Sequence, residues 1–201
     1  MSVLGQERIL SALKAPRLKD RLVITPLLAA GQIGPGSVDV RLGNEFIAVR
    51  RANLPSIDPG AVKETKRHRY QAKHYVNFGD CFHLHPNELV LASTLEYVRL
   101  PRQIAAVVTT RSSWGRVGLV IATATAVHPG FTGCITLELI NHGEVPLILY
   151  PGVSVAQLVL HDTEGAPLYA GKFNHHTGPQ FGTVAESDPH LDFWTKKTFH
   201  P

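Results

Sequence analysis

A chain of 201 residues can bury a substantial hydrophobic core, and we expect one domain over residues 1–201. Hydrophobic residues make up 44% and charged residues 18%, which describes a soluble globular protein; the net charge of +4 favours an anionic partner without choosing between a nucleotide and a nucleic acid. No apolar run approaches the roughly 20 residues that cross a bilayer, and residues 1–16 lack the apolar centre of a secretory signal. We therefore expect no membrane association and a cytoplasmic location.

The N-terminal segment, residues 1 to about 22, is predicted to be helical. Apolar residues recur at helical spacing in Val3–Lys14 and predict a short amphipathic helix, with Gly5 and Pro16 as its start and stop signals. Beyond it, 17 Gly and 14 Pro suggest many turns between short strands, and Gly43-Asn44 is a candidate tight turn. The predicted strands are Leu22–Thr25, Val38–Val49, Phe82–His85, Glu88–Thr94, Glu96–Leu100, Ala105–Thr110, Val117–Thr123, Gly133–Asn141, Pro146–Tyr150 and Val153–His161. Their close spacing predicts a mainly β fold, a sandwich or a barrel.

Two other segments lack a strand pattern. Lys63–His74 is rich in Lys and Arg and is predicted to be a solvated loop or insertion. A nucleic-acid patch is the less favoured alternative, because only Tyr70 and Tyr75 supply aromatic rings beside the charges. Residues 164–201 turn to Gly, His, Pro and Asp and indicate an extended tail, which either folds over a site or is a loose terminus.

A cluster of cationic and hydroxyl side chains lies in Arg111–Gly118. Arg111, Ser112, Ser113 and Arg116 offer guanidinium forks and short donors, which suit a polyphosphate; surface salt bridges are the alternative for the two arginines. This turn is therefore a candidate nucleotide site.

Glu138 follows in an otherwise apolar strand. A carboxylate in such surroundings is costly unless it has a partner or a chemical role, so Glu138 is the catalytic candidate. A structural acid paired with an arginine is the alternative.

A zinc deaminase site is not expected. Such enzymes need His-x-Glu followed by Pro-Cys-x-x-Cys, and His142-Gly143-Glu144 supplies the first half only. Cys81 and Cys134 do not form a Cys-x-x-Cys pair and are instead expected to be buried free thiols. The histidines show no convincing ligand spacing, so we expect neither a structural nor a catalytic zinc.

Several separated motifs together resemble one enzyme family. The stretches Ser37–Gly43, Leu84–Pro86, Arg111–Gly118 and Pro129–Glu138 are similar to those of deoxycytidine triphosphate deaminases, which are related to the trimeric dUTPases. The similarity runs from about residue 22 to 160 and continues weakly into the tail. It implies a distorted β-barrel of the β-clip type with a short N-terminal helix, and a homotrimer with active sites at subunit interfaces.

The resemblance also implies a hydrolytic reaction, dCTP and water giving dUTP and ammonia. Glu138 would act as general base and acid for a water that attacks C4 of cytosine, with Ser112 and Arg116 closest to the chemistry. No metal would touch that carbon, and Mg²⁺ would accompany the triphosphate. Gln157 would be structural. The other nucleotide-binding positions implied lie in the turn, the base-reading strand and the tail: Arg111, Ser113, Thr136, Leu137, Tyr169 and Lys172.

Three departures from the family pattern leave alternatives open. His128 stands where the family has an Asp that holds the sugar 3'-hydroxyl, Thr123–Ala126 lacks the family's His and Arg, and His176 stands where the family has Gln. An imidazole accepts one hydrogen bond and cannot replace a bidentate anionic acceptor, so His128 and His176 are predicted to bind the nucleotide differently. The alternatives are a dUTPase or bifunctional deaminase and dUTPase, or a nucleotide-binding regulatory protein without turnover.

Overall fold

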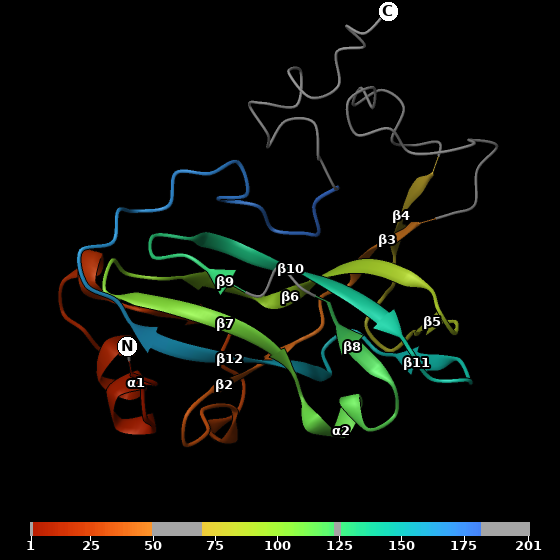
Figure 1. Ribbon diagram of the computed structural model, residues 1–201, viewed down its shortest axis with the longest axis horizontal. Coiled ribbons are helices and arrows are strands. Elements are labelled where there is room, and N and C mark those ends of the chain that lie inside the picture. The colour runs from red at the N-terminus through yellow and green to blue at the C-terminus, as the bar shows by residue number, and fades with distance from the viewer. Residues whose placement is uncertain (1, 50–69, 123–125, 182–201) are drawn as a thin grey trace, which may run out of the picture.

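The computed structural model describes residues 2–49, 70–122 and 126–181 (Figure 1). The predicted N-terminal helix is present as α1, in which Ile9 is fully buried against the sheets. The helices are α1 (Gln6–Leu13), α2 (Ser112–Gly115) and the short 3-10 helices η1 (Leu18–Asp20) and η2 (Ala30–Gln32). In the described part of the chain, no helix is long and apolar enough to cross a membrane.

Strands dominate the rest of the described chain, which confirms the mainly β prediction. They are β1 (Val23–Thr25), β2 (Val38–Arg41), β3 (Glu45–Val49), β4 (Gln71–Tyr75), β5 (Phe82–Leu84), β6 (Leu89–Arg99), β7 (Ile104–Thr110), β8 (Leu119–Ile121), β9 (Ala126–Val127), β10 (Thr132–Asn141), β11 (Leu147–Leu149) and β12 (Ser154–Asp162). The largest sheet has the order β4-β3-β6-β10-β8, with β1 also paired to β6. A second sheet has the order β2-β12-β7-β9, and β11 pairs with β5. Over the described residues these sheets do not close into a true barrel, so the β-clip is distorted and open.

The two larger sheets enclose the hydrophobic core. On β10, Leu137 and Leu139 are almost completely buried, whereas Thr136 and Glu138 between them are half-buried. Because side chains alternate across a strand, Leu137 and Leu139 face the core and Thr136 and Glu138 face the outer side of the sheet. The same alternation that builds the core therefore turns the candidate catalytic carboxylate outward.

Several predicted boundaries differ from the structure. Val38–Val49, predicted as one strand, is divided into β2 and β3, which belong to different sheets. The single long strand β6 joins Glu88–Thr94 and Glu96–Leu100, which were predicted as separate strands. The strand continues through the buried Glu96 because residues from elsewhere in the fold donate hydrogen bonds to its carboxylate. The prediction of a loop over Lys63–His74 is also wrong in part. The last residues of this segment belong to β4, and β4 pairs with β3 along its whole length. Main-chain pairing holds this polar strand in the sheet although its side chains show no apolar alternation. Lys63–Arg69 lies outside the described residues.

The Arg111–Gly118 turn contains a short helix and ends at a glycine with a positive φ. Gly118 has φ +96°, and a Cβ there would lie 2.5 Å from the backbone nitrogen of Gly143. We expect Gly118→Ala to lower the free energy of unfolding by about 2–3 kcal/mol, since the left-handed backbone alone costs 1–3 kcal/mol and the backbone of Gly143 blocks the methyl group. Gly115→Ala is the matched control, because its Cβ meets nothing within 4 Å. Urea denaturation of both variants measures the difference, and equal midpoints would contradict the prediction.

Candidate active site

A cavity of about 560 Å³ lies on the outer face of the largest sheet, beside Glu138. Glu138 is opposite Leu91 in β6, and Leu91 is opposite Ile47 in β3, so these side chains share one face. The cavity is lined mostly by apolar and aromatic side chains with a few polar groups: Val49, Gln71, Leu89, Leu91, Ala126, Val127, His128, Phe131, Cys134, Ile135, Thr136, Glu138, Tyr169, Phe173, Gln180 and Phe181. An apolar hollow with a few directed polar groups is the usual form of a small-molecule site.

Aromatic rings form one wall of this cavity. His128 and Tyr169 are stacked with ring centroids 5.8 Å apart and an interplanar angle of 22°, and Phe131 lies 6.3 Å from the same tyrosine. The main chain fixes this arrangement, since the amide of Tyr169 donates to the carbonyl of Pro129 at 2.7 Å. His128, Tyr169, Thr136 and Glu138 are thus brought together around one cavity, as a nucleotide site would require.

The described part of the tail lies across β9 and the start of β10 (Figure 1). The Cys134 amide donates to the carbonyl of His176 at 2.7 Å. Gly133 permits this approach, because a Cβ at its φ of +147° would lie 2.9 Å from that carbonyl oxygen. Of the two interpretations of the tail, the structure favours the one in which it folds over a site, at least as far as residue 181.

Three predicted site residues of β10 and the tail, Leu137, Lys172 and His176, lie outside the cavity lining. Leu137 is 1% exposed and packs in the core, so only its main chain could meet a ligand from the outer face. Lys172 is exposed with its ammonium 5.3 Å from the centre of the Phe173 ring, and the His176 ring contacts the Lys172 carbonyl at 3.0 Å. The tail therefore presents Tyr169 to the cavity and holds Lys172 beside it.

The predicted phosphate-binding turn lies elsewhere in the monomer. Ser112, Ser113 and Arg116 are exposed on and just after α2, and among the described residues that line the cavity none comes from this turn. Figure 1 places α2 at the edge of the molecule opposite the tail. Trp114 anchors the turn, because its indole Nε1 donates to the carbonyl of Ser154 at 2.9 Å. Within one chain, therefore, Glu138 lines the cavity and Arg116 does not.

Several residues near these two regions were missed from the sequence. Gln71, Phe173, Gln180 and Phe181 line the cavity, and the Oε1 atom of Gln71 is buried and has no hydrogen-bond partner among the described residues. Nothing in the charged sequence around Gln71 signalled a buried position. Asp39 contacts Arg111, and its place between the buried Val38 and Val40 was a usable signal, because alternation turns its carboxylate away from the core.

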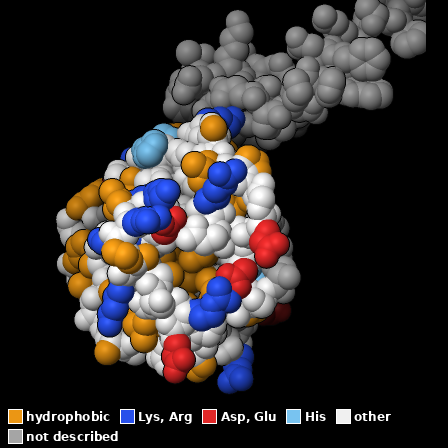
Figure 2. Space-filling model, turned by 90° about the vertical axis from the view of Figure 1, so that its left-hand side faces the viewer, with side chains coloured by type: hydrophobic (Ala, Val, Ile, Leu, Met, Phe, Trp, Pro, Cys, Tyr) orange, Lys and Arg blue, Asp and Glu red, His pale blue; other side chains and the backbone are white. Residues whose placement is uncertain are grey.

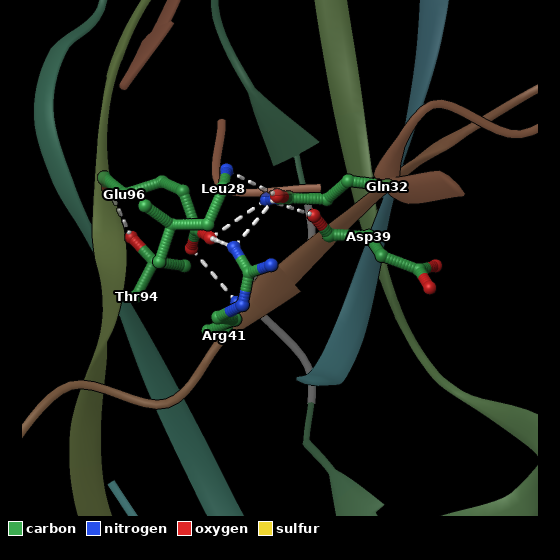
Figure 3. Close-up of polar contacts among 6 residues, drawn as sticks. All are labelled: Leu28, Gln32, Asp39, Arg41, Thr94 and Glu96. Atoms are coloured by element: carbon green, nitrogen blue, oxygen red, sulfur yellow. Dashed lines mark hydrogen bonds and ion pairs between the residues drawn. The ribbon is translucent and has the colours of Figure 1, made fainter. Parts of the chain in front are cut away.

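A buried polar network lies beneath β2 and β6 (Figure 3). Glu96 is fully buried and accepts hydrogen bonds from the Arg41 amide at 2.7 Å, the Arg41 guanidinium at 3.0 Å and the Gln32 amide group at 2.8 Å. Burial raises the pKa of the Glu96 carboxyl above its ordinary value, although the contacts with Arg41 act in the opposite direction. Glu96 therefore pairs with an arginine in the core, and Glu138 lines the cavity.

The two cysteines differ, and the expectation that both thiols are buried is wrong for Cys81. Cys134 is buried, but Cys81 is half-buried, with its sulfur 3.6 Å from the His83 ring nitrogen. Burial, helped by the charges of Glu96 and Glu45, raises the pKa of the Cys134 thiol to about 11.

We expect iodoacetamide at pH 8 to modify Cys81 and leave Cys134 intact in the folded protein. With a pKa of about 11, only roughly 0.1% of the Cys134 thiol is ionised at that pH, and the thiolate is the reactive form. Peptide mass spectrometry after brief labelling gives the result. Labelling of both sites in denaturant is the control, and faster modification of Cys134 in the native protein would contradict the prediction.

In the described residues there is no group of three or more His, Cys, Asp or Glu side chains that could hold a metal ion. Lys and Arg side chains are interleaved with Asp and Glu over the face drawn in Figure 2. On that face the positive charge is dispersed, which differs from the continuous basic stripe typical of nucleic-acid binding.

The family model of the dCTP deaminase-like proteins matches residues 3–163. The chain belongs to this family. It is 42% identical over 160 residues to a "dCTP deaminase, dUMP-forming" of Methanobrevibacter smithii, covering 79% of each chain. It is 41% identical over 160 residues to a "dCTP deaminase" of Natronomonas pharaonis, covering 76% of this chain and 81% of that one. These matches confirm the prediction of an enzyme of the dCTP deaminase type.

A solved structure has a similar fold. The 2'-deoxycytidine 5'-triphosphate deaminase of Agrobacterium tumefaciens aligns with a TM-score of 0.60 at 21% identity. The alignment covers 80% of this chain but 48% of that one, so this chain spans about half of its length. The distorted β fold that the sequence motifs implied is thereby confirmed.

Proposed function

We propose that this protein deaminates dCTP hydrolytically, with Glu138 as the general base that activates water and then as the acid that protonates the amino group so that it leaves as ammonia. The observation that carries the proposal is the outward position of Glu138 in a cavity walled by His128, Tyr169 and Thr136. The relatives at about 40% identity, each named a dCTP deaminase, support the same reaction.

Each residue would contribute a separate step. The Glu138 carboxylate would take a proton from water as the oxygen attacks C4 of cytosine and deliver it to the exocyclic nitrogen. The second water proton would end on N3 of the ring as the C4–N bond breaks, ammonia leaves and the C4 carbonyl forms. Ser112 and Arg116 would donate hydrogen bonds near the reacting ring, and Arg111 and Ser113 would bind phosphate oxygens. Mg²⁺ would arrive with the triphosphate as part of the substrate. Thr136, the Leu137 main chain, Tyr169, Lys172, His128 and His176 would complete nucleotide binding.

We further propose a homotrimer in which the turn of one subunit completes the cavity of the next. Support comes from the separation of the Arg111–Arg116 turn from the Glu138 cavity within one chain. Light scattering should give three times the chain mass of 22.0 kDa. In mixed trimers of Glu138→Gln and Arg116→Ala subunits, part of the activity should return, because some interfaces then combine an intact Glu138 with an intact Arg116. A monomer, or mixed subunits as inactive as the separate variants, would exclude a shared site.

A second product is favoured by a specific observation. The relatives of M. smithii, Halobacterium salinarum and Methanosphaera stadtmanae are each named "dCTP deaminase, dUMP-forming", at 42%, 43% and 39% identity. This chain has His128 in place of the family's Asp, and the absence of that carboxylate argues against hydrolysis of the phosphate chain here. The bifunctional reaction is therefore the second candidate, and the product distinguishes the two.

The deciding experiment incubates the purified protein with Mg²⁺ and, in separate reactions, dCTP, CTP, dCMP and dUTP. Nucleotides are resolved by chromatography and ammonia is measured in parallel. Equal amounts of dUTP and ammonia from dCTP support the proposed reaction, and dUMP with pyrophosphate supports the bifunctional one. Tight binding of dCTP without product would instead indicate a regulatory protein.

A further inference from the structure

Asp39 on β2 connects the phosphate-binding turn to the sheet behind it. Its Oδ2 atom lies 3.2 Å from a terminal nitrogen of Arg111, and its Oδ1 atom accepts a hydrogen bond from the Gln157 amide group at 2.8 Å. The side chain of Asp39 is 17% exposed, against 38% for Arg111. Both carboxylate oxygens therefore have a protein partner, and one of those partners is a candidate phosphate ligand.

The sheet register explains why these three residues meet. Gln157 on β12 is directly opposite Asp39 on β2 and, on its other side, opposite Thr109 on β7. Residues paired in this way point to the same face of a sheet, and Arg111 follows β7 two residues after Thr109. The Arg111 amide also donates to the Val155 carbonyl at 3.0 Å, so its backbone is fixed to the same strand.

The main chain of Asp39 is held from the opposite side. The Gln32 amide group donates to the Asp39 carbonyl at 3.0 Å, and the same Gln32 bonds Arg41 and Glu96 in the buried network. Figure 3 shows the carboxylate of Asp39 pointing away from this network. The aspartate thus has a backbone anchored in the core and a side chain directed outward at Arg111.

We propose that Asp39, oriented by Gln157, is a positioning residue that holds the Arg111 guanidinium in place for the triphosphate of the substrate. Arginine has five N–H donors, so a contact of one terminal nitrogen with Asp39 leaves the others for phosphate oxygens. Fixing the guanidinium in advance reduces the rotamer entropy that binding would otherwise cost. The inference rests on the proposed function in so far as Arg111 binds phosphate.

Charge and orientation predict opposite effects of Asp39→Asn. Removal of a negative charge next to an anion site strengthens anion binding if only the Coulomb interaction counts. Loss of the anchored partner weakens binding if orientation counts. We expect weaker binding of Mg²⁺-dCTP and of inorganic triphosphate by about tenfold, between the small effect of an exposed ion pair and the ~100-fold cost of a misplaced binding group. KM should rise while kcat changes little.

The experiment is a double-mutant cycle on the full-length protein, with binding of inorganic triphosphate measured by calorimetry and ammonia release measured separately. In the Arg111→Ala background, Asp39→Asn should have no further effect on binding, because its partner is already absent. Gln157→Leu should weaken binding in the same direction but less. Asp162→Asn is the matched control, since it breaks the Asp162–Arg8 pair, another Asp–Arg contact, at the end of β12.

The outcomes separate the inference from the proposed function. Additive effects of Asp39→Asn and Arg111→Ala, or unchanged or tighter binding by Asp39→Asn, would overturn the positioning role while leaving deamination intact. Triphosphate binding with the expected cycle but without ammonia release would support the inference and reject deamination. Failure of the wild-type protein to bind either dCTP or triphosphate would reject both. Thermal unfolding of each variant shows whether a loss of binding is a loss of fold.

Discussion

Replacing Glu138 by glutamine is expected to lower the rate of ammonia release from dCTP by about 100- to 10,000-fold, the range that a general acid-base group contributes. Glutamine has nearly the same shape and accepts hydrogen bonds, but it cannot take a proton from water at neutral pH. The side chain lies on the outer face of β10, between the core residues Leu137 and Leu139, so the substitution leaves the packing of the core unchanged. Steady-state ammonia release with saturating dCTP measures the effect.

The control for Glu138→Gln is Glu144→Gln, an identical change at an exposed position in the loop after β10. Glu144 also belongs to the half-motif His142-Gly143-Glu144, so full activity of this variant speaks against a zinc-type mechanism as well. Both variants should keep the wild-type thermal midpoint and bind dCTP. Glu138→Gln with more than about a tenth of the wild-type rate would reject Glu138 as general base.

Replacing Glu96 by glutamine is expected to have the largest effect on stability, a loss of about 3–5 kcal/mol in the free energy of unfolding. An amide group would turn N–H donors toward donors of Arg41 or Gln32 and would leave the Arg41 guanidinium, only 12% exposed, without its counter-charge. Urea denaturation followed by fluorescence gives the difference directly. A change below 1 kcal/mol would show that Arg41 reaches water or another acceptor.

A second variant separates the broken pair from the missing carboxylate. When both partners are replaced by apolar residues, as in Glu96→Leu with Arg41→Met, the loss should be much smaller than for Glu96→Gln, because no buried charge remains. Equal losses in the two variants would indicate that the carboxylate stabilises the fold through the Arg41 main-chain amide and Gln32 rather than through the ion pair.

Much of the fold could be predicted because its signals are local. Helix α1 follows from apolar spacing, and most strands lie within a residue or two of their predicted limits. The failures have a common cause. β4 is a polar strand stabilised by its pairing with β3, and β6 continues through Glu96 because Arg41 and Gln32 satisfy the carboxylate. Neither partner is visible in the local pattern around the segment concerned.

For the candidate site too, the sequence predicted residues from local patterns but not the contacts between distant residues. The sequence predicted Glu138 and the Arg111–Arg116 turn as site residues by residue type and resemblance, and in the structure the alternation of β10 turns Glu138 away from the core. It did not identify Asp39 as the partner of Arg111, nor Gln71 and Phe173 as parts of the cavity. The sequence also placed Glu138 and the turn in one site at a subunit interface, and within one chain no described residue of the turn lines the Glu138 cavity.

The sequence by itself determined the fold class, the family and the chemical types of the site residues, because alternation, turn residues and short motifs act over a few neighbouring positions. Only the tertiary structure decided which distant side chains meet: Asp39 with Arg111, Gln32 with Glu96, and Tyr169 with His128. Such contacts depend on strand order and register, and a shift of one residue would turn each side chain to the opposite face of its sheet.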